Sequence, residues 1–196
     1  MRKWIQRFFA RQMLWLLRGS QIAQFGDISV CDLSKGEPEF KTVMLAALQL
    51  LKDTDLRRFA RVNRHLKWIS NIALSRGGAQ YRHDLQACMI DFVKPETDAQ
   101  FPYYVAWYAS VLVHEATHGV LRTRSILYSR ELRTRIKHLC VTEQNRFAHR
   151  LESTQPKVAK YVHQEFDEAD WHVSWNRKPA PDFLALLRRL FTGRHK

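Results

Sequence analysis

The sequence predicts an α+β protein in which a small β-sheet packs on a central helix and a mostly helical C-terminal part follows. Two observations support this class. Two apolar, strand-like segments, 68–75 (WISNIALS) and 84–93 (DLQACMIDFV), lie on either side of a turn at Gly77 and Gly78. Helical periodicity then dominates the rest of the chain. The predicted helices of this part cover residues 103–121, 129–151 and 157–170.

The N-terminal segment 1–20 is predicted to form a basic amphipathic helix in front of one domain, 21–196. Basic residues share one side of this helix: Lys3, Arg7, Arg11 and Arg18. Apolar residues gather on another: Ile5, Phe8, Phe9, Met13, Leu16 and Leu17. Such a helix either docks on its own domain or lies, through residues 1–18, on an anionic membrane surface.

The remaining segments are assigned in order. Residues 21–40 look irregular because glycine and proline interrupt them, whereas 41–52 is an apolar helix. The basic stretch that follows could continue as helix or lead into a strand. The domain divides at about residue 121, with the sheet and central helix before it and the helical part 122–196 after it. Pro156 interrupts that part, and Asp182 could cap a last short helix.

The composition is strongly basic, with a formal net charge of +13. Such a surface attracts anionic partners or is simply solvated, and both interpretations stay open. No helix-turn-helix, zinc-finger or basic–aromatic motif favours nucleic acid specifically. The three cysteines are widely spaced and odd in number, which indicates a reducing compartment rather than a disulfide framework. We therefore expect a cytoplasmic protein, or one held peripherally at the inner face of a membrane.

The segment 110–121, SVLVHEATHGVL, carries the clearest chemical signal. On a helix, His114 and His118 project from one face, close enough to share one metal ion. Glu115 would lie beside the open side of that ion and act as the general base for an attacking water. The apolar flanks predict a buried helix, in which unpartnered imidazole and carboxylate groups would be costly. A Zn²⁺ site satisfies them; two core histidines held by ordinary hydrogen bonds are the alternative.

The HEATHG residues resemble the active-site helix of the zincin metallopeptidases, over perhaps residues 84–150. This resemblance implies a zincin-like fold, Zn²⁺ as cofactor and hydrolysis of peptide or protein substrates. It also implies that the strand 84–93 is the sheet edge that pairs with an extended substrate. A different interpretation is a binding or regulatory protein on the same scaffold, with little activity, acting at an anionic membrane or nucleic acid.

The third metal ligand is predicted to be Glu143, as in the gluzincin pattern. The metzincin pattern fails because Leu121 and Arg124 occupy its glycine and histidine positions. Glu143 lies 25 residues after His118 in a segment with an apolar stripe, where a carboxylate needs a partner.

Several other assignments stay open. Alternative third ligands are Cys88, in a peptide-deformylase-like arrangement, His138 and His149. Candidates for orienting the histidines are Asp91, Asp167 and Asp170. Candidates for stabilising an oxyanion are Tyr128, Tyr161, His163 and His172.

Overall fold

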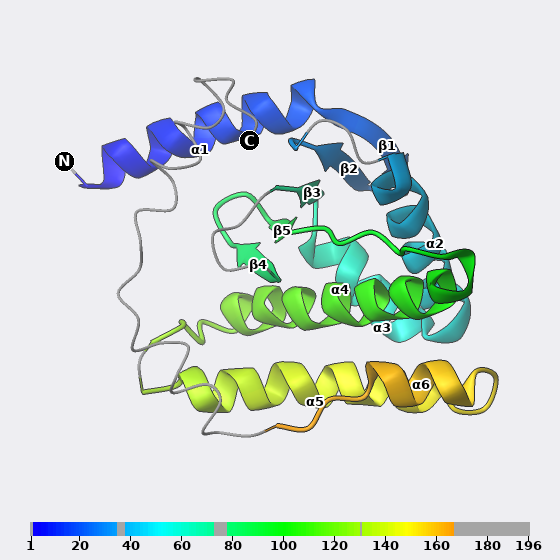
Figure 1. Cartoon of the computed structure of the whole chain (residues 1–196). Coiled ribbons are helices and arrows are strands. Elements are labelled where there is room, and N and C mark those ends of the chain that lie inside the picture. The colour runs from blue at the N-terminus through cyan, green and yellow to red at the C-terminus, as the bar shows by residue number, and fades with distance from the viewer. Residues whose placement is uncertain (1, 35–37, 73–77, 130, 167–196) are drawn as a thin grey trace.

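The computed structural model describes residues 2–34, 38–72, 78–129 and 131–166, and of residues 2–7 only the backbone. Its elements follow in chain order: α1 (Arg2–Gly19), β1 (Gln21–Phe25), β2 (Ile28–Asp32), α2 (Pro38–Thr54), α3 (Leu56–His65), β3 (Trp68–Asn71), β4 (Ala79–Arg82), β5 (Ala87–Ile90), a 3₁₀ turn at Asp98–Gln100, α4 (Phe101–Thr123), α5 (Arg133–Leu151) and α6 (Pro156–Val162). The protein is thus α+β, as predicted, with five strands and six α-helices in its described part (Figure 1).

The strands form one sheet in the order β1-β2-β3-β5-β4. Strands β2, β3 and β5 are parallel, and the two outer strands run antiparallel to their neighbours. Side chains alternate between the faces, as strand geometry requires: Cys88 and Ile90 point to one face, Ala87 and Met89 to the other. Both faces are buried, which explains why β5 is apolar throughout.

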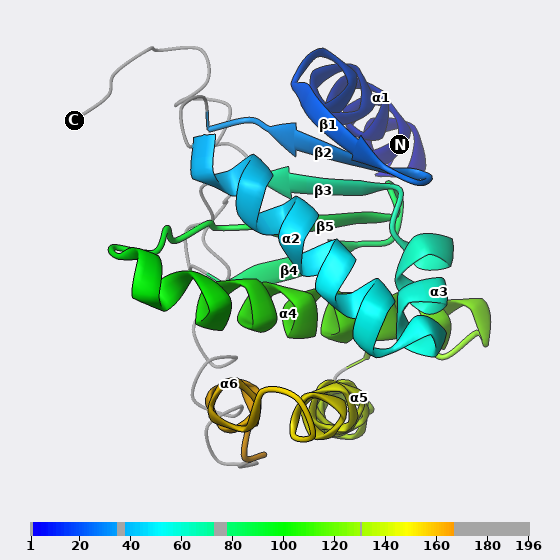
Figure 2. The ribbon, with the colours of Figure 1, turned by 90° about the vertical axis from the view of Figure 1, so that its right-hand side faces the viewer.

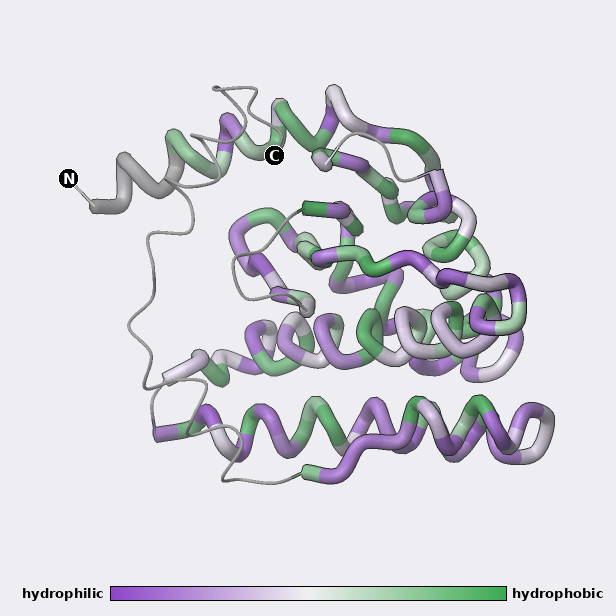
Figure 3. Tube along the Cα trace, in the orientation of Figure 1, coloured by the Kyte–Doolittle hydropathy of each residue, from purple (hydrophilic) through white to green (hydrophobic). Residues whose placement is uncertain are grey.

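Helices cover both faces of the sheet (Figure 2). Helix α1 packs on one face through Met13 and Leu17, which join the smaller of the two sheet clusters. Helices α2 and α4 cover the opposite face, and α5 and α6 pack on the far side of α4. Along α5, hydrophilic and hydrophobic residues alternate (Figure 3), because only one side of this helix faces α4. Helix α4 therefore lies between the sheet on one side and helices α5 and α6 on the other.

The N-terminal helix docks on the sheet, although one side of it remains in solvent. Trp15 is 72% exposed, and Phe8, Arg11 and Arg18 are exposed beside it. Membrane contact through residues 1–18 stays a prediction and would use this outer side. No helix in the described ranges has the length and hydropathy that crossing a membrane requires.

Three sequence predictions about strands need correction. Residues 21–32 are not irregular but form the β1–β2 hairpin, whose turn uses Gly26 at a φ of +58°. The segment 84–93 contributes only β5, which lies inside the sheet. The edge strand beside α4 is β4, which the sequence analysis treated as part of the turn. The basic stretch after α2, for which helix and strand entry were both open, forms helix α3. The Asp55 carboxylate caps this helix.

Two predicted helices extend further in the sequence analysis than in the structure. The predicted helix 129–151 begins at Arg133, and within the described part of 157–170, which ends at residue 166, the helix is α6 and ends at Val162. The proposed last helix after Asp182 lies outside the described residues, as do Asp167, Asp170 and His172.

Candidate metal centre

Helix α4 places the two motif histidines on its buried side. Pro102 occupies the first turn of this helix, where its missing N–H costs nothing. Between Val105 and Leu121 most side chains are buried, since the helix packs against the sheet on one side and α5 on the other. The rings of His114 and His118 lie 5.4 Å apart, and both face α5. The prediction that these two side chains lie together on a buried helix is confirmed.

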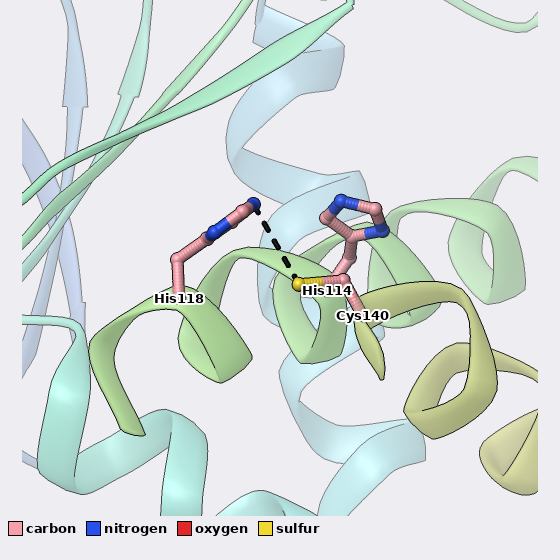
Figure 4. Close-up of side chains that lie close together, drawn as sticks. All are labelled: His114, His118 and Cys140. Carbon is pink, nitrogen blue, oxygen red and sulfur yellow. Dashed lines mark hydrogen bonds between the residues drawn. The ribbon is translucent and has the colours of Figure 1, made fainter. Parts of the chain in front are cut away.

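Cys140 of α5 completes a three-residue cluster with them (Figure 4). Its Sγ lies 3.6 Å from Nε2 of His118, and the three candidate ligand atoms lie within 4.8 Å of one another. Tetrahedral zinc with bonds of about 2.3 Å to sulfur and about 2.0–2.1 Å to nitrogen separates such ligands by about 3.6 Å. The His118–Cys140 pair matches this separation, and the three residues together form a group that could hold a metal ion once their side chains move slightly closer.

A buried hydrogen-bond chain fixes the orientation of His114. Ser110 Oγ donates to the Trp107 carbonyl at 2.7 Å, so its oxygen is left to accept from Gln144 Nε2 at 3.0 Å. Gln144 must then present Oε1 to His114 Nδ1, 3.1 Å away. An amide oxygen only accepts, so Nδ1 carries the hydrogen and Nε2 keeps its lone pair. This is the tautomer that a metal bound through Nε2 requires.

The electrostatic environment keeps the two histidines neutral. Burial and the neighbouring Lys137 ammonium lower the pKa of His114 to about 4 and that of His118 to about 3. Burial raises the pKa of the Cys140 thiol to about 12. The imidazoles are thus ready to bind a cation, whereas the thiol must release its proton when one binds.

Lys137 lies directly over the cluster. Its Nζ is 3.5 Å from Nε2 of His114, where it can donate to the lone pair that a metal would use. A divalent ion and an ammonium repel each other at this range. Metal binding therefore requires the flexible Lys137 side chain to swing away from His114.

Glu115 lies at the junction of two cavities that border the cluster. One has a volume of about 450 Å³ and is also lined by His118 and Tyr128; the other, of about 490 Å³, is also lined by His114 and Tyr161. Glu115 is 4% exposed, and its carboxylate accepts a hydrogen bond from the backbone N–H of Tyr81 in β4. Burial raises its pKa to about 7, a value suited to proton transfer near neutral pH.

Glu143, which the sequence predicts as the third ligand, does not join the cluster in this structure; arginines bind its carboxylate instead. One of its oxygens binds Arg58 at 3.0 Å and Arg61 at 2.6 Å, and the other binds Arg146 at 2.5 Å. These arginines hold the pKa of Glu143 below its usual value despite partial burial. The side of α5 that faces the histidines carries Cys140 and Gln144, and Glu143 is rotated away from them.

The alternative third ligands do not join the cluster either. His138 and His149 are exposed, and His149 binds Glu152 at 2.7 Å. Cys88 is buried in β5, and Gln144 rather than Asp91 orients His114. Tyr128 lies 5.9 Å from the His118 ring, whereas His163 is exposed. Cys140 was not predicted as a ligand, because a lone cysteine on an apolar helix stripe looks like an ordinary core residue.

Comparison with protein-family models, with curated proteins and with solved structures gives no match to this chain.

Proposed function

We propose that this protein is a zinc-dependent metallopeptidase with a zincin-like fold, in which Cys140 takes the place predicted for Glu143. The observation that carries the proposal is the donor set itself. Two neutral imidazoles and one thiol converge within 4.8 Å, and a buried carboxylate stands beside them. Three protein ligands leave a fourth position open, which distinguishes catalytic from structural zinc sites.

A bound zinc ion would supply a Lewis acid that polarises a carbonyl and makes water more acidic. Side chains would carry out the proton transfer and stabilise the oxyanion. Glu115 would take a proton from the attacking water and pass it to the leaving amine, which its raised pKa favours. Tyr128 is the strongest candidate for an oxyanion donor, because it lines the cavity of His118 and Glu115. Burial raises the pKa of its hydroxyl to about 12, so it stays protonated and can donate.

Substrate would lie along β4. This strand pairs only with β5 among the described strands, so its other edge borders the two cavities. The N–H of Tyr81, which donates to Glu115, shows that polar backbone atoms of this edge point toward the site. An extended peptide could add to the edge by backbone hydrogen bonds and place a carbonyl near the cluster. The sheet edge that pairs with substrate, which the sequence predicted at 84–93, is therefore proposed to be β4.

The test is hydrolysis of a quenched-fluorescence peptide library by zinc-loaded protein. Glu115→Gln keeps the shape of the side chain but removes the base, so we expect turnover to fall by about 10²- to 10⁴-fold with zinc content unchanged. Glu152→Gln, an exposed acid at the end of α5, is the matched control and should retain full activity. Full activity of Glu115→Gln, or failure of the wild type to take up zinc, would overturn the proposal.

If wild-type protein binds zinc but cleaves nothing, a binding or regulatory role on the same scaffold is favoured over an enzymatic one. A binding or regulatory protein would keep its partner in the Glu115→Gln variant, whereas an enzyme would lose its effect on substrate. The cytoplasmic location and the partners at anionic surfaces remain predictions from the sequence.

A further inference from the structure

A third cavity lies behind the metal centre, between α3 and the C-terminal end of α4. Its volume is about 320 Å³. Its polar lining is basic or neutral: Arg57, Arg61, Arg64, His65, Thr123 and Arg124. No acidic side chain of the described residues lines it.

The arginines converge because of their spacing. Arg57, Arg61 and Arg64 recur at intervals of four and three residues, which places them along one face of α3. Arg124 reaches the same cavity from the end of α4. In the described part of the chain, the guanidinium groups of Arg57, Arg64 and Arg124 form no ion pair. These three arginines are solvent-exposed and line the cavity without a protein counter-ion among the described residues.

Two acidic groups that pair with residues of α3, Asp55 and Glu143, are already engaged by arginines. Asp55 caps α3 and pairs with Arg58, while Glu143 binds Arg58 and Arg146 as well as Arg61. Only Arg61 of the cavity shares in this pairing. Like charges held together raise the free energy of the folded protein, so a concentration of arginines at one cavity indicates an anionic ligand.

His65 contributes a further polar group to the cavity. Its side chain lines the cavity although the residue is only 7% exposed, and its ring nitrogens are not fully enclosed, since Asn63 Oδ1 is the only fully buried side-chain polar atom without a partner among the described residues. Its neutral ring keeps one N–H, which can donate to an oxygen bound among the arginines.

We propose that this cavity binds a small ligand with two or more linked phosphate groups. Guanidinium groups bind phosphate oxygens in pairs of parallel hydrogen bonds, and several linked phosphates are needed to use four converging arginines. The volume suits a short phosphate chain or a multiply phosphorylated headgroup rather than a large molecule. The site is on the side of α4 away from Cys140, so it does not depend on the proposed peptidase activity.

The test is a calorimetric titration of the folded, zinc-loaded protein with inorganic tripolyphosphate at low ionic strength. We expect saturable binding that weakens as salt is added. The double variant Arg64→Gln/Arg124→Gln should bind at least about 10-fold more weakly, since each lost contact is a charge-assisted hydrogen bond. The double variant keeps the metal cluster intact, so any heat released when tripolyphosphate chelates zinc is the same for the variant and the wild type. Arg135→Gln, an exposed change on α5, is the matched control and should bind like the wild type.

Competition then identifies the source of the phosphates. Vesicles that carry a phosphoinositide bisphosphate would displace tripolyphosphate if the natural ligand is a lipid headgroup, and would fail to do so if it is soluble; either result supports the site. An oligonucleotide that binds through Arg64 and Arg124 while tripolyphosphate does not would overturn the proposal. Equal binding by the double variant and the wild type would also overturn it, because the arginines would then act only at the helix ends.

Discussion

Replacement of Cys140 by alanine tests the metal centre most directly. The Cys140 sulfur already lies 3.6 Å from His118 Nε2, which is the separation that a shared zinc ion requires. Removing it leaves two imidazoles on one helix. Changes to groups that merely orient a ligand cost about 10- to 100-fold in affinity, so loss of the ligand itself should cost at least about 100-fold, or about 2.7 kcal/mol.

The loss of zinc affinity in Cys140→Ala should not result from unfolding of the protein. Cys140 is fully buried, but the change to alanine removes a single sulfur atom, which we expect to destabilise the fold by about 1 kcal/mol. Circular dichroism before and after zinc addition checks this point. The zinc dissociation constant follows from competition with a chromophoric chelator. Cobalt substitution adds a second readout, because only a thiolate ligand gives a strong sulfur-to-cobalt charge-transfer band.

Glu143→Gln is the matched comparison on the same helix. Because its oxygens bind Arg58, Arg61 and Arg146, we expect this variant to keep zinc but to lose about 2 kcal/mol of unfolding free energy in urea. Zinc affinity unchanged in Cys140→Ala and abolished in Glu143→Gln would refute the assignment and restore the glutamate set predicted from the sequence.

Three further predictions concern the surroundings of the cluster. Lys137→Met should bind zinc about 10-fold more tightly in the same competition assay, because the ammonium no longer occupies His114 Nε2. Gln144→Leu should weaken zinc binding about 10- to 100-fold, and Gln144→Glu should restore much of it, because the carboxylate again accepts from Nδ1. In metal-free protein near pH 5.5, the unfolded chain holds about two protons on His114 and His118 that the folded chain lacks, because folding lowers both pKa values, whereas Glu115, with its raised pKa, holds one proton only in the folded state. The net difference of about one proton should lower the unfolding free energy by about 1.4 kcal/mol per pH unit as pH falls around 5.5 in urea titrations; a flat profile would contradict these shifts.

The sequence identified the central helix and its two histidines because their signal is local. An i, i+4 pair needs only helical geometry to place both rings on one face, and apolar flanks are sufficient to predict burial. The α+β class could be predicted for the same reason. The third ligand could not be predicted from the sequence, since its identity depends on which side of α5 contacts α4. Cys140 and Glu143 are three positions apart, and both lie near the apolar stripe.

The sheet topology was missed for a related reason. Strands β1 and β4 are short, lie at the edges and carry glutamines, so their apolar pattern is weak. Their identity comes from pairing with β2 and β5, which is a tertiary property. The correction matters for function, because β4 rather than 84–93 borders the candidate cleft.

Gly119 connects the two sites, since it directly follows His118 on the side of α4 that faces α3. A Cβ at this position would lie 2.7 Å from Cβ of His65 and 3.0 Å from the Tyr81 hydroxyl. The His65 Cβ is attached directly to the backbone of α3, so α3 would have to move, whereas the Tyr81 hydroxyl is the tip of a side chain and could shift on its own.

Gly119→Ala should therefore be destabilising, by about 1–2 kcal/mol in urea unfolding, although alanine is the better helix former by about 1 kcal/mol. Gly19→Ala is the matched control: no atom lies within 4 Å of its added Cβ, and we expect little change or slight stabilisation. Because His65 lines the basic cavity and Tyr81 borders the metal centre, displacement at Gly119 should weaken both tripolyphosphate and zinc binding. Stability equal to wild type in Gly119→Ala would show that α3 and α4 do not approach as closely as described.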